Sequence, residues 1–203
     1  MTNLTIEHSS PTTVAPPCRT LRIMYADTLK LIATAIRRRP SHRLHRCLDA
    51  LLRRLADIAS APWAEETQDE IWRLWMSYPD RRAVIELERA TRAIVAQDFS
   101  AAERILHRLV ALHPGYAEAW HKRGTLYYMQ QRDEESVRDF HRALLLEPRH
   151  FGAMLAFAEL CTACGRRDDA LFALDVALRL NPHLADTRQQ FERLLLERRG
   201  VPH

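Results

Sequence analysis

The chain has 203 residues and a formal net charge of +4, and 47% of its residues are hydrophobic. This length suits one domain with enough apolar material for a continuous core. No apolar run approaches the ~20 residues that a membrane-spanning helix needs, and the amino terminus lacks the charged-then-apolar layout of a secretory signal. The sequence therefore predicts a globular, helix-rich chain without either feature.

The N-terminal part divides into a tail and a set of helices. Residues 1–17 carry serine, threonine and three prolines with little periodicity, so we expect a disordered tail. Apolar residues three or four apart predict a helix over 21–39 and a second helix after Ser41. Pro62 ends the second helix, and a third follows it with Ile71, Trp72 and Trp75 on its apolar face.

The excess of positive charge is also N-terminal. Residues 1–60 hold ten basic and four acidic side chains, a net charge of +6, and the remainder has a net charge of −2. Such a region could attract RNA or an acidic partner. The simpler interpretation is a solvated arginine face, since 28 of the 30 basic residues are arginine (30 minus Lys30 and Lys122).

A 34-residue period governs the second half of the chain. Proline recurs at Pro114, Pro148 and Pro182, and a fixed period of this size is typical of helical repeat arrays. Small residues recur in the same register, because two antiparallel helices approach closely only where small residues face each other. Proline ends the second helix of each unit, since it cannot donate to the helix ladder.

The copy between Pro114 and Pro148 resembles the tetratricopeptide repeat. The residues that fill the family pattern, in order, are Trp120, Gly124, Tyr127, Ser136, Phe140, Ala143 and Pro148. Arg123 departs from it, since an aliphatic residue is usual there. The resemblance implies an all-α fold, a right-handed superhelical array of antiparallel helix pairs.

In this register we expect three repeats over residues 83–182, with the pairs 83–96 and 100–112, 117–130 and 134–147, and 151–164 and 168–181. One further period back, Ala56, Trp72 and Trp75 coincide with packing positions, which predicts a degenerate repeat within the N-terminal helices at 18–82. Residues 183–203 are predicted to form a capping helix and a tail, as repeat arrays require.

Signals for catalysis or metal binding are weak. Cys161 and Cys164 form a CxxC motif, which can mark a redox pair or half of a zinc site. A second pair at suitable spacing is missing, and Cys161 coincides with the packing residue Tyr127. No glycine-rich phosphate loop or nucleophile elbow occurs. We therefore predict that the protein is not an enzyme and has no metal or cofactor.

The function implied by the resemblance is protein–protein interaction. In the family the first helix of each pair lines a concave groove that holds a partner peptide or helix. The positions that match the groove residues, which we expect to contact the partner, are Leu87, Thr91, Glu118, His121, Thr125, Tyr128, Leu155 and Glu159. We predict a non-catalytic scaffold or adaptor, with RNA or acidic-partner binding through the basic N-terminal helices as the alternative. The expected location is the cytoplasm, and organelle import through the acid-poor N-terminus is an open alternative.

Overall fold

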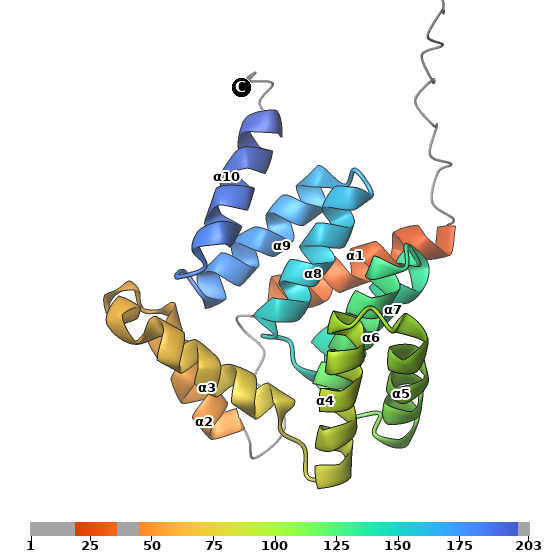
Figure 1. The fold of residues 1–203 in the computed structure, drawn as a ribbon. Helices are drawn as coiled ribbons and strands as arrows, with labels where there is room; N and C mark the ends of the chain where they lie inside the picture. The colour runs from red at the N-terminus through yellow and green to blue at the C-terminus, as the bar shows by residue number, and fades with distance from the viewer. Residues whose placement is uncertain (1–18, 36–44, 199–203) are drawn as a thin grey trace, which may run out of the picture.

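The computed structural model describes residues 19–35 and 45–198, and the predicted tail at 1–17 lies outside them. Within these ranges the chain is all helical (Figure 1). The elements are α1 (Arg19–Thr34), α2 (His45–Ala56), the 3₁₀ helix η1 (Ile58–Trp63), α3 (Ala64–Met76), α4 (Arg81–Val95), α5 (Phe99–Leu112), α6 (Ala117–Met129), α7 (Asp133–Leu146), α8 (Phe151–Ala163), α9 (Arg167–Leu180) and α10 (Ala185–Arg198).

Helices α4 to α9 form three antiparallel pairs, α4–α5, α6–α7 and α8–α9, and the second helix of each pair also packs on the first helix of the next. The bounds agree with the predicted pairs to within two residues. The small packing residues are buried where the register places them. Gly124 lies so close to Phe140 that an added Cβ would come within 2.8 Å of its ring, and the Ser136 hydroxyl donates to the Gly124 carbonyl at 2.9 Å.

The turn within each pair uses a left-handed residue at equivalent positions 34 apart. Gln97 and Gln131 both have φ of 58°, and Gly165 has φ of 70°. Glycine adopts this conformation without strain, whereas a side chain costs roughly 1 kcal/mol there. The predicted turn at Gly165 is therefore confirmed, and the two glutamines occupy the same conformation less favourably.

Arg123, the departure from the family pattern, has a local partner. Its guanidinium forms two hydrogen bonds to the buried Asp139 carboxylate of α7, at 2.6 and 2.9 Å. It also lies over the rings of Trp120 and Tyr127. A bidentate ion pair thus joins α6 to α7 where an aliphatic contact is usual.

The array curves toward its first helices. Direct contacts join α4 to α6 and α6 to α8, whereas contacts of similar extent do not join α5 to α7 or α7 to α9. Because the first helices are closer together, their common surface is the concave side. We call it the inner face.

The remaining helices wrap around the last two repeats. Helix α1 lies against α7 and α9, where Tyr25 and Ile32 are buried, and Thr28 Oγ1 lies 3.2 Å from His141 Nδ1. Helices α2 and α3 form a hairpin that contacts α6 and α9, and rings of α3 pack on the residues that open α8. Helix α10 packs on α9, with Leu194 buried.

The hairpin α2–α3 does not continue the array, which corrects the predicted degenerate repeat. In a stacked repeat, α3 would pack along α4 as α5 packs along α6, and no contact of that extent is present. Glu86 of α4 forms its ion pairs within the first helix pair, with Arg89 at 2.7 Å and with Arg108 of α5 at 2.5 Å, and the neighbouring Ile85 is 46% exposed. The array of stacked pairs therefore begins at α4.

Among the described residues, no helix combines the length and apolar character needed to cross a membrane.

Candidate functional site

The inner face consists of equivalent residues from α4, α6 and α8. Counting by 34, its rows are Leu87, His121 and Leu155; Thr91, Thr125 and Glu159; Ile94, Tyr128 and Thr162; and Val95, Met129 and Ala163. The first row, with Glu118 and Gly152 one turn earlier, lies toward the start of the helices. The other three rows lie toward the ends of the same helices. The part of the inner face near the helix starts and the part near the helix ends differ in what covers them.

The part near the helix starts is filled by α3. The indole of Trp72 faces His121, with ring centroids 6.3 Å apart, and packs so closely on α8 that a Cβ on Gly152 would lie 2.5 Å from it. Trp75 stacks on the imidazole of His150, with centroids 4.1 Å apart and planes 11° apart. The chain thus supplies its own occupant for this part, which we call the filled half.

The same occupancy extends to the first repeat. Leu87 is fully buried in a cluster against which Met76 and Tyr78 pack. Tyr78 stacks on Tyr116, with ring centroids 4.5 Å apart, and the Tyr116 hydroxyl donates to the Met76 carbonyl. The end of α3 and the segment after it therefore cover the start of α4 and α6.

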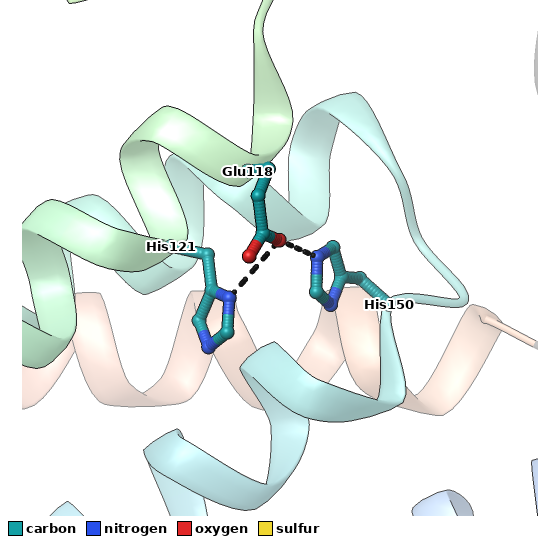
Figure 2. A group of neighbouring side chains, drawn as sticks. All are labelled: Glu118, His121 and His150. Carbon is teal, nitrogen blue, oxygen red and sulfur yellow. Dashed lines mark hydrogen bonds and ion pairs between the residues drawn. The ribbon is translucent and has the colours of Figure 1, made fainter. Parts of the chain in front are cut away.

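Beneath the two tryptophans lies a cluster of three buried polar side chains. Figure 2 shows the carboxylate of Glu118 between two imidazoles, one from the same helix and one from the start of α8. Glu118 Oε2 lies 3.1 Å from His121 Nδ1 and 2.7 Å from His150 Nε2. Its Oε1 has no hydrogen bond but lies 3.2 Å from Nζ of Lys122. We call Glu118, His121 and His150 the buried triad.

The protonation of the triad follows from its contacts. His150 Nδ1 accepts from the Ala153 N–H at 3.1 Å and so caps α8, which leaves the ring proton on Nε2 for donation to Glu118. Burial lowers the pKa of His150 in spite of the adjacent carboxylate, so its imidazole is neutral. Burial alone would raise the pKa of Glu118, but the two imidazoles hold it well below its usual range.

Two imidazoles and a carboxylate within 4.8 Å of one another also form a potential metal-ligand set. However, a nitrogen can bind a metal only through a lone pair, and His150 Nε2 carries a proton while Nδ1 caps the helix. The Lys122 ammonium beside Glu118 also disfavours a cation. The contacts therefore favour a hydrogen-bonded structural cluster. Trp72 and Trp75 pack against the cluster, in which Glu118 and His150 are fully buried and His121 is 6% exposed.

This arrangement corrects part of the predicted groove. Glu118 is fully buried and His121 is 6% exposed, so neither offers a polar contact to a partner as the sequence suggested. Leu87 is also fully buried and Leu155 is half-buried against the core. These four residues support the fold from within because α3 covers the half to which they belong.

The other predicted residues lie in the part near the helix ends, the open half. Thr91, Thr125 and Tyr128 are half-buried and Glu159 is exposed. The Thr91 and Thr125 hydroxyls donate to the carbonyls of Leu87 and His121 in their own helices, at 2.9 and 3.1 Å. Each of these threonines therefore offers mainly its methyl group to a partner on the inner face.

Two apolar residues of the open half were missed by the sequence reasoning. Val95 is 80% exposed and Met129 is 43% exposed, each directly after a half-buried residue of the preceding row. Ala163 is the exposed equivalent in the third repeat. Their 34-residue spacing could have identified them, because each directly follows a residue of the row that contains Tyr128. The open half thus presents an apolar row beside Tyr128.

His150 was also missed, and with it the docking of α3. The signal available was a histidine directly before a predicted helix, where a side chain can cap the first turn. Arg149 beside it is buried and forms ion pairs with Glu147, at 3.4 Å, and with Asp49 of α2. The turn between α7 and α8 therefore holds both helices of the hairpin.

The CxxC motif belongs to no group of three or more potential metal ligands among the described residues, although Cys164 Sγ lies 3.4 Å from Asp133 Oδ2. Cys161 is buried in the core and Cys164 is exposed, and the two thiols are free. Burial raises the pKa of Cys161 and that of Cys164, which makes both poor nucleophiles and metal ligands.

Comparison with known proteins agrees with the geometry. Residues 117–150, which span α6, α7 and the following turn, match the tetratricopeptide repeat family. The chain is 29% identical over 147 residues to a TPR repeat-containing protein of Rhizobium etli, covering 72% of each protein. It is also 29% identical over 87 residues to RNA polymerase II-associated protein 3 of Homo sapiens, covering 43% of this chain and 13% of that protein. Three stacked helix pairs, small packing residues in register and these similarities together show that α4 to α9 form an array of the tetratricopeptide-repeat type.

Proposed function

We propose that the protein is a non-catalytic scaffold whose open half binds a segment of a partner polypeptide. Proteins with these repeats are interaction modules, and the open half is the part of the inner face over which α3 does not extend among the described residues. The observation that carries the proposal is the exposed apolar row, Val95 and Met129, beside the half-buried ring of Tyr128. Exposed apolar side chains in register on one face are typical of interaction sites.

The chemistry of the open half favours apolar contacts. The threonine hydroxyls are already bonded within their helices, so they add little to polar recognition. Tyr128 is the natural anchor because an aromatic ring buries a large area with few rotatable bonds. Glu159 is the charged side chain on the same rows and suits a polar contact at one end of the segment.

The filled half explains why the partner should bind toward the helix ends. Trp72 and Trp75 occupy the position that a partner would take near Gly152 and His121. A partner on the inner face must therefore lie along α3 or on the far side of it. The open half is the surface that meets this condition.

Within the described residues, no contact favours the alternative of RNA or acidic-partner binding through the N-terminal helices. Helix α1 buries Tyr25 and Ile32 against the array, and Lys30 is paired with Asp27 at 2.8 Å. The triple arginine at 37–39 lies outside the described residues.

The proposal is tested by quantitative affinity purification of the full chain with two matched double variants. Val95→Ser with Met129→Ser removes the exposed row. Leu112→Ser with Leu145→Ser removes residues of similar exposure, 67% and 42%, from second helices on the other side. Circular dichroism must first show that both variants melt like the wild type.

We expect a prominent partner to be lost with the Val95 and Met129 pair and kept with the control pair. Partners that both variants retain, or that only the control variant loses, contradict the proposal. In the latter case the interaction surface lies on the second helices.

A further inference from the structure

A second surface feature lies where α3 and α10 begin. A cavity of about 560 Å³ opens between the starts of these helices, which approach each other beside the turn that joins α9 to α10 (Figure 1). Ala61, Ala64 and Leu184 provide apolar wall residues, and Glu65 of α3 and Asp186 of α10 also line the cavity. The volume is within the range of side-chain and small-ligand sites in proteins.

The walls of the cavity are fixed to one another. Asn181 Nδ2 donates to Gln68 Oε1 at 2.6 Å, and the His183 N–H donates to Asn181 Oδ1 at 3.1 Å. His183 Nε2 lies 3.2 Å from the Asp57 carbonyl. These bonds tie the α2–α3 hairpin to the turn before α10. The cavity is therefore preformed, which lowers the cost of ordering it on binding.

The charges of the lining side chains determine which charge a ligand of the cavity can carry. The Glu65 and Asp186 carboxylates are exposed, and neither forms an ion pair with another described residue. Among the residues that the structure describes, no lysine or arginine lines the cavity, and His183 is the basic residue in its wall. Helix starts attract anions, but here each start already carries its own carboxylate, so an anionic ligand would be repelled. The cavity suits a cation.

Apolar surface continues from the cavity along η1. Trp63 is 56% exposed and Ile58 is 76% exposed, on the same short helix that contributes Ala61, and the Arg54 guanidinium lies over the Trp63 ring at 6.0 Å from its centroid. Large apolar residues exposed beside a charged cavity are typical of a polypeptide interface and not of a site for a small free cation. The ligand should therefore carry a basic group together with an apolar neighbour.

We propose that this cavity binds an arginine or lysine side chain of a partner polypeptide, with an apolar residue next to it packing on Trp63. The aliphatic stem lies on Ala61, Ala64 and Leu184, and the charged head lies between Glu65 and Asp186. Long basic side chains bind in this way because the aliphatic stem packs on apolar surface while the charged head pairs with carboxylates. The inference rests on the proposed function only in that the ligand is a polypeptide; its site is separate from the open half.

The test is selection of a random 12-residue phage-displayed peptide library on the full chain, followed by fluorescence anisotropy with the strongest peptide. Three double variants are compared with the wild type. Glu65→Gln with Asp186→Asn neutralises the cavity. Asp69→Asn with Glu192→Gln makes the same change on exposed acids of the same two helices away from the cavity. Val95→Ser with Met129→Ser removes the row of the open half.

We expect the selected peptides to carry a basic residue beside an apolar one, and the cavity variant to bind at least about fivefold more weakly than the wild type. The acid control should bind like the wild type. Selected peptides without basic residues, or equal binding by the cavity variant and the acid control, overturn the inference. If such peptides fail only on the Val95 and Met129 variant, the proposed function stands without the cavity. If neither the cavity variant nor that variant weakens binding, both proposals fail.

Discussion

Replacing Gly152 with alanine tests whether α3 truly occupies the inner face. The new Cβ would lie 2.5 Å from Cη2 and 3.1 Å from Cζ2 of Trp72, whereas carbon atoms in good contact are about 3.5–4.0 Å apart. The indole must therefore retreat by roughly 1 Å from a site where it packs against His121, His150 and Phe151. Overpacking of this kind costs about 1–3 kcal/mol.

Whether Gly152→Ala raises or lowers the free energy of unfolding shows whether the Trp72 indole packs on α8. Without the indole, alanine in place of glycine near the start of a helix would stabilise the protein by up to about 1 kcal/mol. With it, that gain offsets only part of the clash, and we expect a net loss of about 1–2 kcal/mol in the free energy of unfolding. Urea denaturation of the full chain, followed by circular dichroism at equilibrium, measures the difference.

Two further variants make the test specific. Trp72→Phe removes the ring atoms that would clash, so the combination with Gly152→Ala should lose less stability than the sum of the single variants, with a coupling of about 0.5–3 kcal/mol. Gly115→Ala is a control, since its Cβ would meet nothing closer than 3.8 Å. If Gly152→Ala stabilises the protein, or if the two changes are additive, α3 does not pack on α8 as described.

The remaining predictions concern the turns, acid and metals. Gln131→Gly should stabilise the protein by up to about 1 kcal/mol, since Gln131 has φ of 58°; a loss of stability in urea melts would mean that this turn conformation is wrong. Stability should fall as the pH decreases from about 7 to about 5, because His150 stays neutral when folded but takes up a proton near 6.5 when unfolded, and fall further below 4.5 as Glu118 must be protonated. His150→Asn should flatten the upper part of this dependence, and an unchanged slope would contradict the neutral imidazole. Zinc added to the purified protein should leave its melting temperature unchanged; a stoichiometric metal lost in His150→Asn would show that the buried triad is a metal site.

Local patterns explain why the array could be predicted from the sequence. The packing of α6 against α7 depends on Gly124, Phe140 and Ala143, and each is near enough in the chain for its spacing to indicate a helix pair. The prolines that end the second helices recur at the same interval. Such signals survive because each repeat contacts mainly its neighbours.

The placement of α3 could not be predicted in the same way. Trp72 meets Gly152 and His150, which are far from it in the chain, and no periodic pattern relates them. Counting by 34 placed Trp72 at a packing position of a repeat, whereas α3 makes no contact with α4 as extensive as that of α5 with α6. The tryptophans were too large for that position, and this misfit was the available clue.

The residues of the candidate site also follow from the repeat register, but their burial does not. The repeat register assigns residues to the inner face, but it contains no information about what covers them. The register predicted that Glu118 and His121 would contact a partner, whereas in this chain they are buried with His150. Tyr128 and Glu159 were assigned by the same rule, and the absence of a cover over them leaves their predicted role as a proposal.

Photo-crosslinking tests the central claim most directly. A photoreactive phenylalanine analogue in place of Met129 reports on the open half, and the same analogue in place of Leu145, which has similar exposure on a second helix, reports on the other side. After irradiation of cells that produce the full chain, mass spectrometry identifies the attached polypeptide. The account predicts a crosslink to a defined segment of one partner from position 129 and none to that segment from position 145; crosslinks from position 145 alone would contradict it.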